Sequence, residues 1–322
     1  MRFATRANGT ADGELILISR DGTRCAALGA RWPNLLHAIA DWDALLDDAA
    51  SLSTTLEAGG GEPVDQAALL APLPRTWQWL DGSAFANHGA LMEKAFNHPP
   101  IETDLPLMYQ GMSHRFLAPR EDVAFPTEAD FIDFEGEFGI VTDDVPMGCS
   151  ADEAMAHIRL IILLNDWSLR AVAPKEMKTG FGWIQAKPAC SAAPIAITPD
   201  ELGDDWRDGR VCLPLRVEVN GAWFGHPSGE HMGYGFHELI AHAARTRHLC
   251  AGTIIGSGTV SDADYRTVGS TCMSERRAIE MIEHGKPVTP FLSFGDHVRM
   301  TAGTEGSSPF GELSQTVIAF NP

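Results

Sequence analysis

The segment that most constrains this chain is an apolar stretch, residues 133–141, that two glutamates interrupt; it reads DFEGEFGIV. The stretch predicts a strand, and strand residues two apart point to the same face, so Glu135 and Glu137 converge with backbones roughly 6.6 Å apart. Two like charges this close repel each other, and each resists desolvation. A hard divalent cation resolves the conflict because it prefers carboxylate oxygens. The alternative is an edge strand with a solvated acidic face, and this segment alone leaves both interpretations open.

Size and composition indicate an ordinary globular chain. Its 322 residues are 44% hydrophobic and 21% charged, enough for one large domain or two smaller ones. No apolar run approaches the roughly 20 residues that span a bilayer, and the N-terminus lacks the apolar core of a signal peptide. We therefore expect a cytoplasmic protein. The net charge of −19 argues against nucleic acid, which is bound mainly through Lys and Arg, but not against an anionic substrate near a metal.

The cysteines indicate a reducing compartment and no zinc site. They are scattered without a CxxC pair, which disfavours zinc ligation by cysteine pairs. We expect buried free thiols. The six positions are Cys25, Cys149, Cys190, Cys212, Cys250 and Cys272.

The first 70 residues predict a small separate unit of strands and a helix. Apolar residues 15–18 form a strand, and the turn signal at residues 20–23 predicts a hairpin. A helix opens near Pro33, because apolar residues follow at helical spacing. A flexible, glycine-rich break at residues 59–63 then leads into the main body. We place the domains at residues 1–70 and 71–322.

The main body predicts short strands with a few helices. The S-x-x-E pattern at residues 150–153 is a capping box, and its helix would bury the apolar residues from 158 to 161. Asn220-Gly221 between alternating segments predicts a hairpin. A second helix is expected from Phe236 to about Arg247. The chain is therefore predicted as an α+β fold, mostly β, and not as a doubly wound sheet.

Three charged residues interrupt apolar segments further along the chain. Asp166 follows the apolar run at residues 160–164, and buried aspartate is rare unless it is paired or metal-bound. Arg170 either pairs with Asp166 or faces a substrate carboxylate. Lys187 lies among small and apolar residues, where burial without a partner is costly. The alternative for Lys187 is a surface lysine with only its stem buried.

Two further motifs are ambiguous alone. Residues 256–261, GSGTVS, could cradle an anion with backbone N–H groups, but they also suit an ordinary turn and are not a P-loop. His88 follows Asp81 by seven residues. A histidine near a metal-bound carboxylate can act as a general base. A lone histidine, however, is more often a surface or core residue.

The order and spacing of these motifs resemble the fumarylacetoacetate hydrolase family. The resemblance rests on the E-x-E pair at residues 135–137, the NDWSxR block at 165–170, the lysine at 187 and the GSGT at 256–259. It covers about residues 75–320, and the first 70 residues resemble the small β-rich cap domain of longer members. The resemblance implies a C-terminal mixed β-sandwich roll that usually forms a homodimer.

The resemblance also implies roles for individual residues. It implies Mg²⁺ or Ca²⁺, with Mn²⁺ as an alternative, held by Asp81, Glu135, Glu137 and Asp166. It implies that His88 is the catalytic base and that Lys187 stabilises developing negative charge. Glu275 is the nearest candidate for the acid that orients the histidine, displaced by about two residues from the family position. The residues that match substrate-binding positions are Tyr109, Arg170 and Thr259.

The implied activity is hydrolysis of a carbon–carbon bond in a β-diketo acid. The substrate would be fumarylacetoacetate, giving fumarate and acetoacetate, or an acylpyruvate, as in aromatic amino-acid catabolism. Residues 171–177 depart from the family, because they lack the Gln and Tyr that contact substrate in the animal enzymes, and one residue is inserted before Lys187. The alternatives are a 2-oxo acid decarboxylase, hydratase or isomerase of the same superfamily, and a non-catalytic, metal-stabilised binding protein. No nucleic acid or membrane partner is expected.

Overall fold

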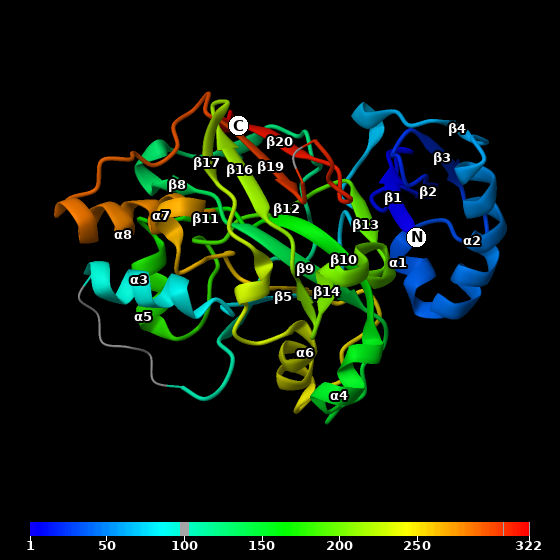
Figure 1. The fold of residues 1–322 in the computed structure, drawn as a ribbon, viewed down its shortest axis with the longest axis horizontal. Coiled ribbons are helices and arrows are strands. Elements are labelled where there is room, and N and C mark those ends of the chain that lie inside the picture. Colours follow the sequence, from blue (N-terminus) through cyan, green and yellow to red (C-terminus); the bar gives the residue numbers. More distant parts are fainter. Residues whose placement is uncertain (97–102, 305, 322) are drawn as a thin grey trace.

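Two sheets form the framework of the molecule, as the computed structural model of residues 1–96, 103–304 and 306–321 shows (Figure 1). The larger sheet has the spatial order β4 (Glu62–Pro63), β3 (Arg24–Ala27), β2 (Glu14–Ile18), β1 (Arg2–Arg6), β13 (Ile195–Ile197), β10 (Ile158–Asn165), β9 (Gly136–Thr142), β18 (Ile254–Gly256), β5 (Trp79–Gly82) and β6 (Met108–Gln110), with β12 (Ser191–Ala192) paired to β10. The smaller sheet has the order β17 (Ala222–Gly225), β16 (Leu215–Val219), β19 (His297–Ala302), β20 (Leu313–Ala319) and β7 (Val123–Phe125). Short pairs join β11 (Ser168–Leu169) to β8 (Ile132–Asp133) and β14 (Trp206–Arg207) to β15 (Arg210–Val211).

The helices gather at the two ends of the molecule and beneath it in the view of Figure 1. One end carries α3 (Ala86–Phe96), α5 (Ala173–Thr179), α7 (Tyr265–Val268) and α8 (Met273–His284), and the other carries α1 (Leu35–Ala38) and α2 (Trp42–Glu57). The remaining helices are α4 (Ala151–Ala154) and α6 (Phe236–Ala244). Strands of both directions with segregated helices confirm the predicted α+β, strand-rich class. In the part of the chain that the structure describes, no helix has the length and apolar character needed to cross a membrane.

Strand β10 lies at the centre of the core and corrects one prediction. The capping box at Ser150 and Glu153 is present, but its helix ends at Ala154 and a 3-10 turn completes it. Residues 158–165, expected partly in that helix, form β10 instead. The physical reason is that both faces of β10 are buried: alternate residues face one apolar cluster with β1, β2 and α2, and the others face a second cluster with the smaller sheet. An apolar run buried on both faces lacks the alternation that would identify it as a strand.

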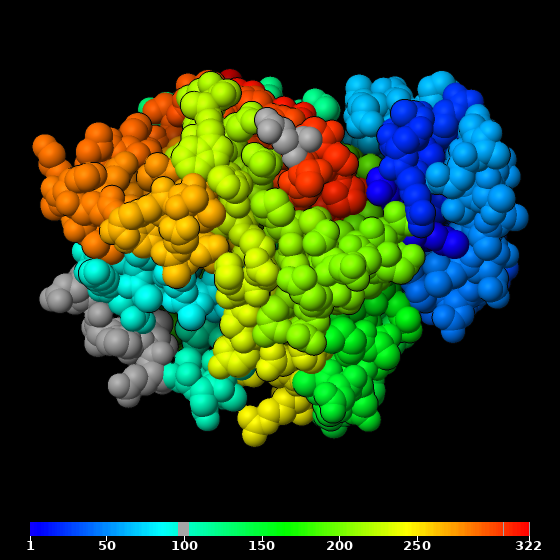
Figure 2. Space-filling model, viewed as in Figure 1, coloured from blue at the N-terminus to red at the C-terminus, as the bar shows by residue number. Residues whose placement is uncertain are grey.

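The N-terminal segment extends the larger sheet. The predicted strand and hairpin are confirmed as β2 and β3, and β1 pairs antiparallel with both β2 and β13. The predicted helix is divided: Asn34 caps α1, a 3-10 turn follows, and α2 continues to Glu57. The break at residues 59–63 contains the short strand β4. Figure 2 shows this segment as a blue lobe packed against the rest of the molecule, and a domain boundary at residue 70 stays a prediction.

Two other predictions concern turns and helix ends. The Asn220-Gly221 hairpin is confirmed between β16 and β17, with φ of 53° and 74° at the two turn residues. Helix α6 begins at Phe236 as predicted but ends at Ala244, because the Arg247 N–H bonds back to the Ala244 carbonyl in a turn.

The cysteines are free, as expected, but not all are buried. Four lie in the interior, whereas Cys212 is partly exposed and Cys250 is exposed. The expectation of uniformly buried thiols was therefore wrong for these two.

Candidate active site

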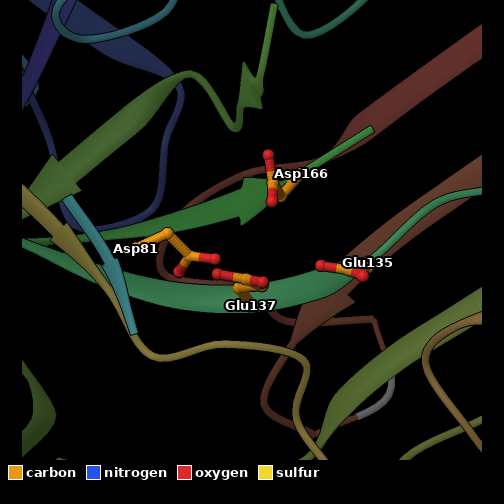
Figure 3. A group of neighbouring side chains, drawn as sticks. All are labelled: Asp81, Glu135, Glu137 and Asp166. Atoms are coloured by element: carbon orange, nitrogen blue, oxygen red, sulfur yellow. The ribbon is translucent and has the colours of Figure 1, made fainter. Parts of the chain in front are cut away.

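Four carboxylates from separate parts of the chain converge in the interior (Figure 3). One oxygen from each of Asp81, Glu135, Glu137 and Asp166 lies within 4.8 Å of the others. Asp81 lies in β5 and Glu137 in β9, whereas Glu135 directly precedes β9 and Asp166 directly follows β10. Leu164, near the end of β10, is paired with Glu137, near the beginning of β9, so the end of β10 lies beside the beginning of β9. The structure thus brings together all four predicted metal ligands.

Gly256 of β18 leaves the space that the carboxylates occupy. It is paired with Asp81 on one side and Gly139 on the other, so it lies at the floor of the cluster. A Cβ atom at Gly256 would lie 2.4 Å from Asp81 Oδ1 and 2.9 Å from Glu137 Oε2. The GSGT segment therefore makes room for carboxylates and donates its Gly258 N–H to Asp81 Oδ1 at 3.2 Å. This contact is to a protein carboxylate, not to the external anion that the segment suggested.

Several oxygens of the cluster lack the partner that a buried polar atom requires. All four carboxylates are buried, and both oxygens of Glu137 and Oδ1 of Asp166 accept no hydrogen bond from the described residues. An unpaired buried carboxylate oxygen is costly, and such groups normally bind a metal or a donor. An all-oxygen set of this kind fits a hard divalent cation. The donor set therefore fits the metal expected from the sequence.

The electrostatics of the cluster support the same conclusion. Burial, together with the charge of Asp166, raises the pKa of Asp81 to about 8. Burial and the adjacent Asp81 raise the pKa of Glu137 well above its usual range. The pKa of Asp166 is likewise raised, chiefly by burial. These carboxylates can be ionised together at neutral pH only with a nearby positive charge.

Lys187 and Arg170 supply part of that positive charge on the Glu135 side. Lys187 Nζ donates to Glu135 Oε2 at 2.7 Å and also to Asp166. Arg170 donates Nε to Asp133 Oδ2 at 2.8 Å and its Nη2 to Glu135. Although burial opposes it, these two cations lower the pKa of Glu135. Glu135 and Glu137 therefore differ in charge environment despite lying two residues apart.

These contacts exclude one of the two alternatives that the sequence left open for Arg170 and one of the two for Lys187. Arg170 does not pair with Asp166 in the structure; it pairs with Asp133 and Glu135, because the β8–β11 pairing brings Asp133 opposite Ser168. Lys187 is not a surface lysine, since its side chain is only 10% exposed and binds two carboxylates.

Asp133 has a structural role that the sequence did not reveal. Its carboxylate accepts N–H groups of Met273 and Ser274 at the start of α8, as well as the Ser274 hydroxyl. With Arg170 on the same carboxylate, Asp133 connects the carboxylate cluster to α8. The sequence did contain a sign that Asp133 matters, because Asp133 belongs to the same acidic stretch as Glu135 and Glu137. Nothing local indicated its distant partners.

His88 and Glu275 form a pair on two packed helices, α3 and α8. His88 Nδ1 lies 2.9 Å from Glu275 Oε2. Glu275 is fully buried, and its other oxygen has no partner among the described residues. The His88 side chain is 18% exposed and therefore reaches solvent. His88 is one of the groups that lower the pKa of Glu135, so the pair lies close to the cluster.

Tyr109 and Thr259, two of the predicted substrate-binding residues, differ in their contacts. Tyr109 donates its hydroxyl to Asp166 Oδ2 at 2.7 Å, and its ring lies 5.5 Å from Lys187 Nζ. Thr259 is buried next to Gly258. Tyr109 therefore lies at the cluster, whereas Thr259 adjoins it through the GSGT segment.

Comparison with models of known protein families identifies the family of this chain. Residues 78–318 match the model for the fumarylacetoacetate (FAA) hydrolase C-terminal domain. The chain belongs to the fumarylacetoacetate hydrolase family. Residues 1–75 match the fumarylacetoacetase N-terminal domain 2, in agreement with the resemblance of the N-terminal segment to a cap domain.

The individual relatives of this chain within the fumarylacetoacetate hydrolase family are distant in sequence. A 2,4-didehydro-3-deoxy-L-rhamnonate hydrolase of Sphingomonas sp. is 28% identical over 50% of this chain and 54% of its own length. A fumarylacetoacetase of Emericella nidulans is 27% identical over 58% of this chain and 50% of its own. The chain spans about half the length of the curated relatives it matches. Among solved structures, a maleylpyruvate hydrolase of Sphingobium sp. SYK-6, in complex with manganese (II) ion and pyruvate, has a TM-score of 0.67 at 17% identity with both chains fully covered.

Proposed function

We propose that this chain is a metal-dependent hydrolase that cleaves a carbon–carbon bond in a β-diketo acid, such as an acylpyruvate or fumarylacetoacetate. The observation that carries the proposal is the His88–Glu275 pair, with Nδ1 2.9 Å from Oε2, close to a cluster of carboxylates with unpaired oxygens. A hydrolase needs a group that takes a proton from water and a site that polarises the carbonyl. The hydrolases among the relatives support this class of reaction.

Asp81, Glu135, Glu137 and Asp166 would hold the cation. Their oxygen-only donors suit Mg²⁺ or Ca²⁺, and the manganese and pyruvate in the maleylpyruvate hydrolase structure support Mn²⁺ and a 2-oxo acid as further candidates. When bound, a divalent cation supplies Lewis-acid polarisation of carbonyl oxygens and neutralises enolate charge.

His88 would act as the general base. Buried Glu275 accepts the Nδ1–H of the imidazole, so the lone pair of Nε2 is free to take a proton from water. The hydroxide adds to the carbonyl, and the carbon–carbon bond then breaks so that its electron pair leaves as the enolate of the second product. The protonated His88 returns its proton to the enolate carbon, which completes the addition of one water to the substrate.

The cationic side chains would bind and stabilise negative charge. Lys187 lies at the cluster with its ammonium group between Glu135 and Asp166, where it can stabilise the oxyanion of the tetrahedral intermediate. Arg170 Nη1 has no partner among the described residues, and it remains available to a substrate carboxylate. We assign the same carboxylate-binding role to Tyr109 and include Thr259 in the substrate site.

Decarboxylases, hydratases and isomerases of the same superfamily remain the alternative reaction classes, because they use the same kind of cation site without hydrolysing a carbon–carbon bond. Products distinguish them. We expect acetylpyruvate to give equal amounts of acetate and pyruvate with Mg²⁺ present, and fumarylacetoacetate to give fumarate and acetoacetate. Release of CO₂ from oxaloacetate, or tautomer interconversion without cleavage, would reassign the reaction. A metal-loaded protein that turns over no member of this panel would favour a non-catalytic binding protein.

A further inference from the structure

The turn before Lys187 is built around one carboxylate, that of Glu176 in α5. Glu176 Oε1 accepts the N–H of Gln185 at 2.9 Å, and Oε2 accepts that of Ala186 at 3.0 Å. The N–H of Ile184 donates to both oxygens, at 3.2 and 3.1 Å. A carboxylate that accepts successive backbone N–H groups organises the chain around itself, because charge-assisted hydrogen bonds are stronger than neutral ones.

Apolar burial holds only the end of this turn in place, where Ala186 is buried. Phe181 is 97% exposed and Ile184 is 83% exposed, so neither contributes core packing. The Ala186 carbonyl accepts the Leu169 N–H at 2.8 Å, which ties only the end of the turn to β11. The hydrogen bonds to Glu176 are therefore the main restraint on residues 184 and 185, and at Ala186 they add to its burial and its carbonyl contact.

The turn places two side chains against Tyr109 at the candidate active site. Trp183 packs edge-on against the Tyr109 ring, with centroids 6.3 Å apart and an interplanar angle of 88°. Lys187 extends to Glu135 and Asp166, with its Nζ 5.5 Å from the centroid of the Tyr109 ring. Because Lys187 directly follows the three restrained amides, the course of its backbone is set by Glu176.

We propose that Glu176 is a positioning residue that fixes Lys187 at the carboxylate cluster. It touches neither the cluster nor the proposed substrate carboxylate, and it acts through the turn that it organises. Glu176 lies in the 171–177 segment that departs from the family pattern. The kinetic consequence rests on the proposed function, whereas the placement of Lys187 does not. A displacement of about 1 Å in a charge-stabilising group can cost up to about 10²-fold in rate.

The first test measures position without turnover. Glu176→Ala should raise the rate at which an amine-reactive reagent modifies Lys187, measured by peptide mass spectrometry, by roughly tenfold, since the ammonium group is protected only while paired. Hydrogen exchange at residues 184–186 should accelerate in the same variant. Glu280→Ala is the matched control, because Glu280 accepts the N–H groups of Val288 and Thr289 in a similar way at the far end of α8. Unchanged Lys187 reactivity in Glu176→Ala, or an equal rise in Glu280→Ala, would overturn the proposal.

The second test uses a kinetic cycle. Glu176→Ala should lower kcat by about 10–100-fold with little change in Mg²⁺ affinity, measured by calorimetry. Glu176→Gln keeps one acceptor oxygen, so its kcat should lie between those of Glu176→Ala and the wild type. In a Lys187→Met background, Glu176→Ala should cause no further loss, because both changes remove the same interaction. Additive losses would contradict positioning through Lys187. If the wild type turns over no β-diketo acid, the proposed function fails while the reactivity test still decides the role of Glu176.

Discussion

Glu137 and His88 serve the same candidate site but are held by different kinds of structure. Glu137 projects from a central strand, is fully buried, and neither of its oxygens has a hydrogen-bond partner among the residues that the structure describes. His88 lies on a helix at the molecular surface and is paired with Glu275 of a second helix. The strand half of the site thus has a carboxylate without any partner among the described residues, whereas the helical half pairs its carboxylate with a histidine through one oxygen. Cation binding and proton transfer should therefore be separable by mutation.

The largest effect is expected in the strand half. Glu137→Gln keeps the shape of the side chain but removes a charge from a set that we propose binds a cation. We expect Mg²⁺ affinity, measured by calorimetry, to fall by more than about 100-fold. This loss is larger than the one caused by removing a residue that only supports a metal ligand. Turnover should disappear with it. Wild-type Mg²⁺ affinity in this variant would contradict the assignment of Glu137.

The next effect lies in the helical half and should leave the cation in place. His88→Ala should lower kcat by about 10²–10⁴-fold, the usual contribution of general acid–base catalysis, with nearly unchanged Mg²⁺ affinity. His37→Ala, at an exposed histidine of α1, is the matched control and should behave as the wild type. Unchanged turnover in His88→Ala would remove His88 from the mechanism, and parallel loss of Mg²⁺ affinity would show that the halves are not separable.

Asp133 connects the two halves, so its substitution should affect both moderately. Asp133→Asn weakens the contacts to Arg170 and to the first amides of α8, the helix that carries Glu275. We expect the free energy of unfolding to fall by about 1.5–3 kcal/mol, the range for hydrogen bonds to a charged group. Urea denaturation measures this loss, and kinetics should show a smaller decrease than His88→Ala. A variant as stable as the wild type would show that the contacts of Asp133 contribute nothing to the free energy of unfolding.

The smallest effect is a dependence of thermal stability on pH that the cation should remove. In metal-free protein Asp81 has a pKa of about 8, against about 3.9 in an unfolded chain, so the folded state binds its proton more tightly. Stability therefore falls as pH rises through this interval, because the unfolded state ionises first. We expect Tm in EDTA to decrease from pH 5 to pH 8, and the Tm increase caused by Mg²⁺ to widen. Asp81→Asn should make the dependence in EDTA shallower, with the remainder due to Glu137 and Asp166, whose pKa values are also raised; a dependence as steep as in the wild type would show that Asp81 does not contribute to it.

The sequence predicted which carboxylates lie together better than it predicted parts of the fold. Short-range signals succeeded where local chemistry decides the structure, as at the Ser150 capping box and the Asn220-Gly221 turn. The apolar run at residues 158–165 was partly misassigned because burial on both faces erases periodicity. The four carboxylates were found together because their order along the chain is typical of a family, not because any single residue indicated a metal.

The contacts that sequence could not supply are the long-range ones. Asp133 and Glu176 act through backbone N–H groups, which every residue except proline offers, so no residue pattern identifies their partners. The pairing of Arg170 with Asp166 was wrong, because strand pairing places Arg170 beside Asp133 and Glu135, and its contact with a substrate carboxylate stays a prediction. The homodimer and the cytoplasmic location stay predictions.

The most direct test of the central claim is the cation dependence of carbon–carbon cleavage by the full chain. Protein is treated with EDTA, exchanged into metal-free buffer and assayed with acetylpyruvate, or with whichever substrate of the panel is cleaved fastest, while Mg²⁺ is added back. We expect no cleavage without the cation and recovery that saturates near one Mg²⁺ per chain, with the two acid products formed in equal amounts. Full activity in the metal-free protein would contradict this expectation.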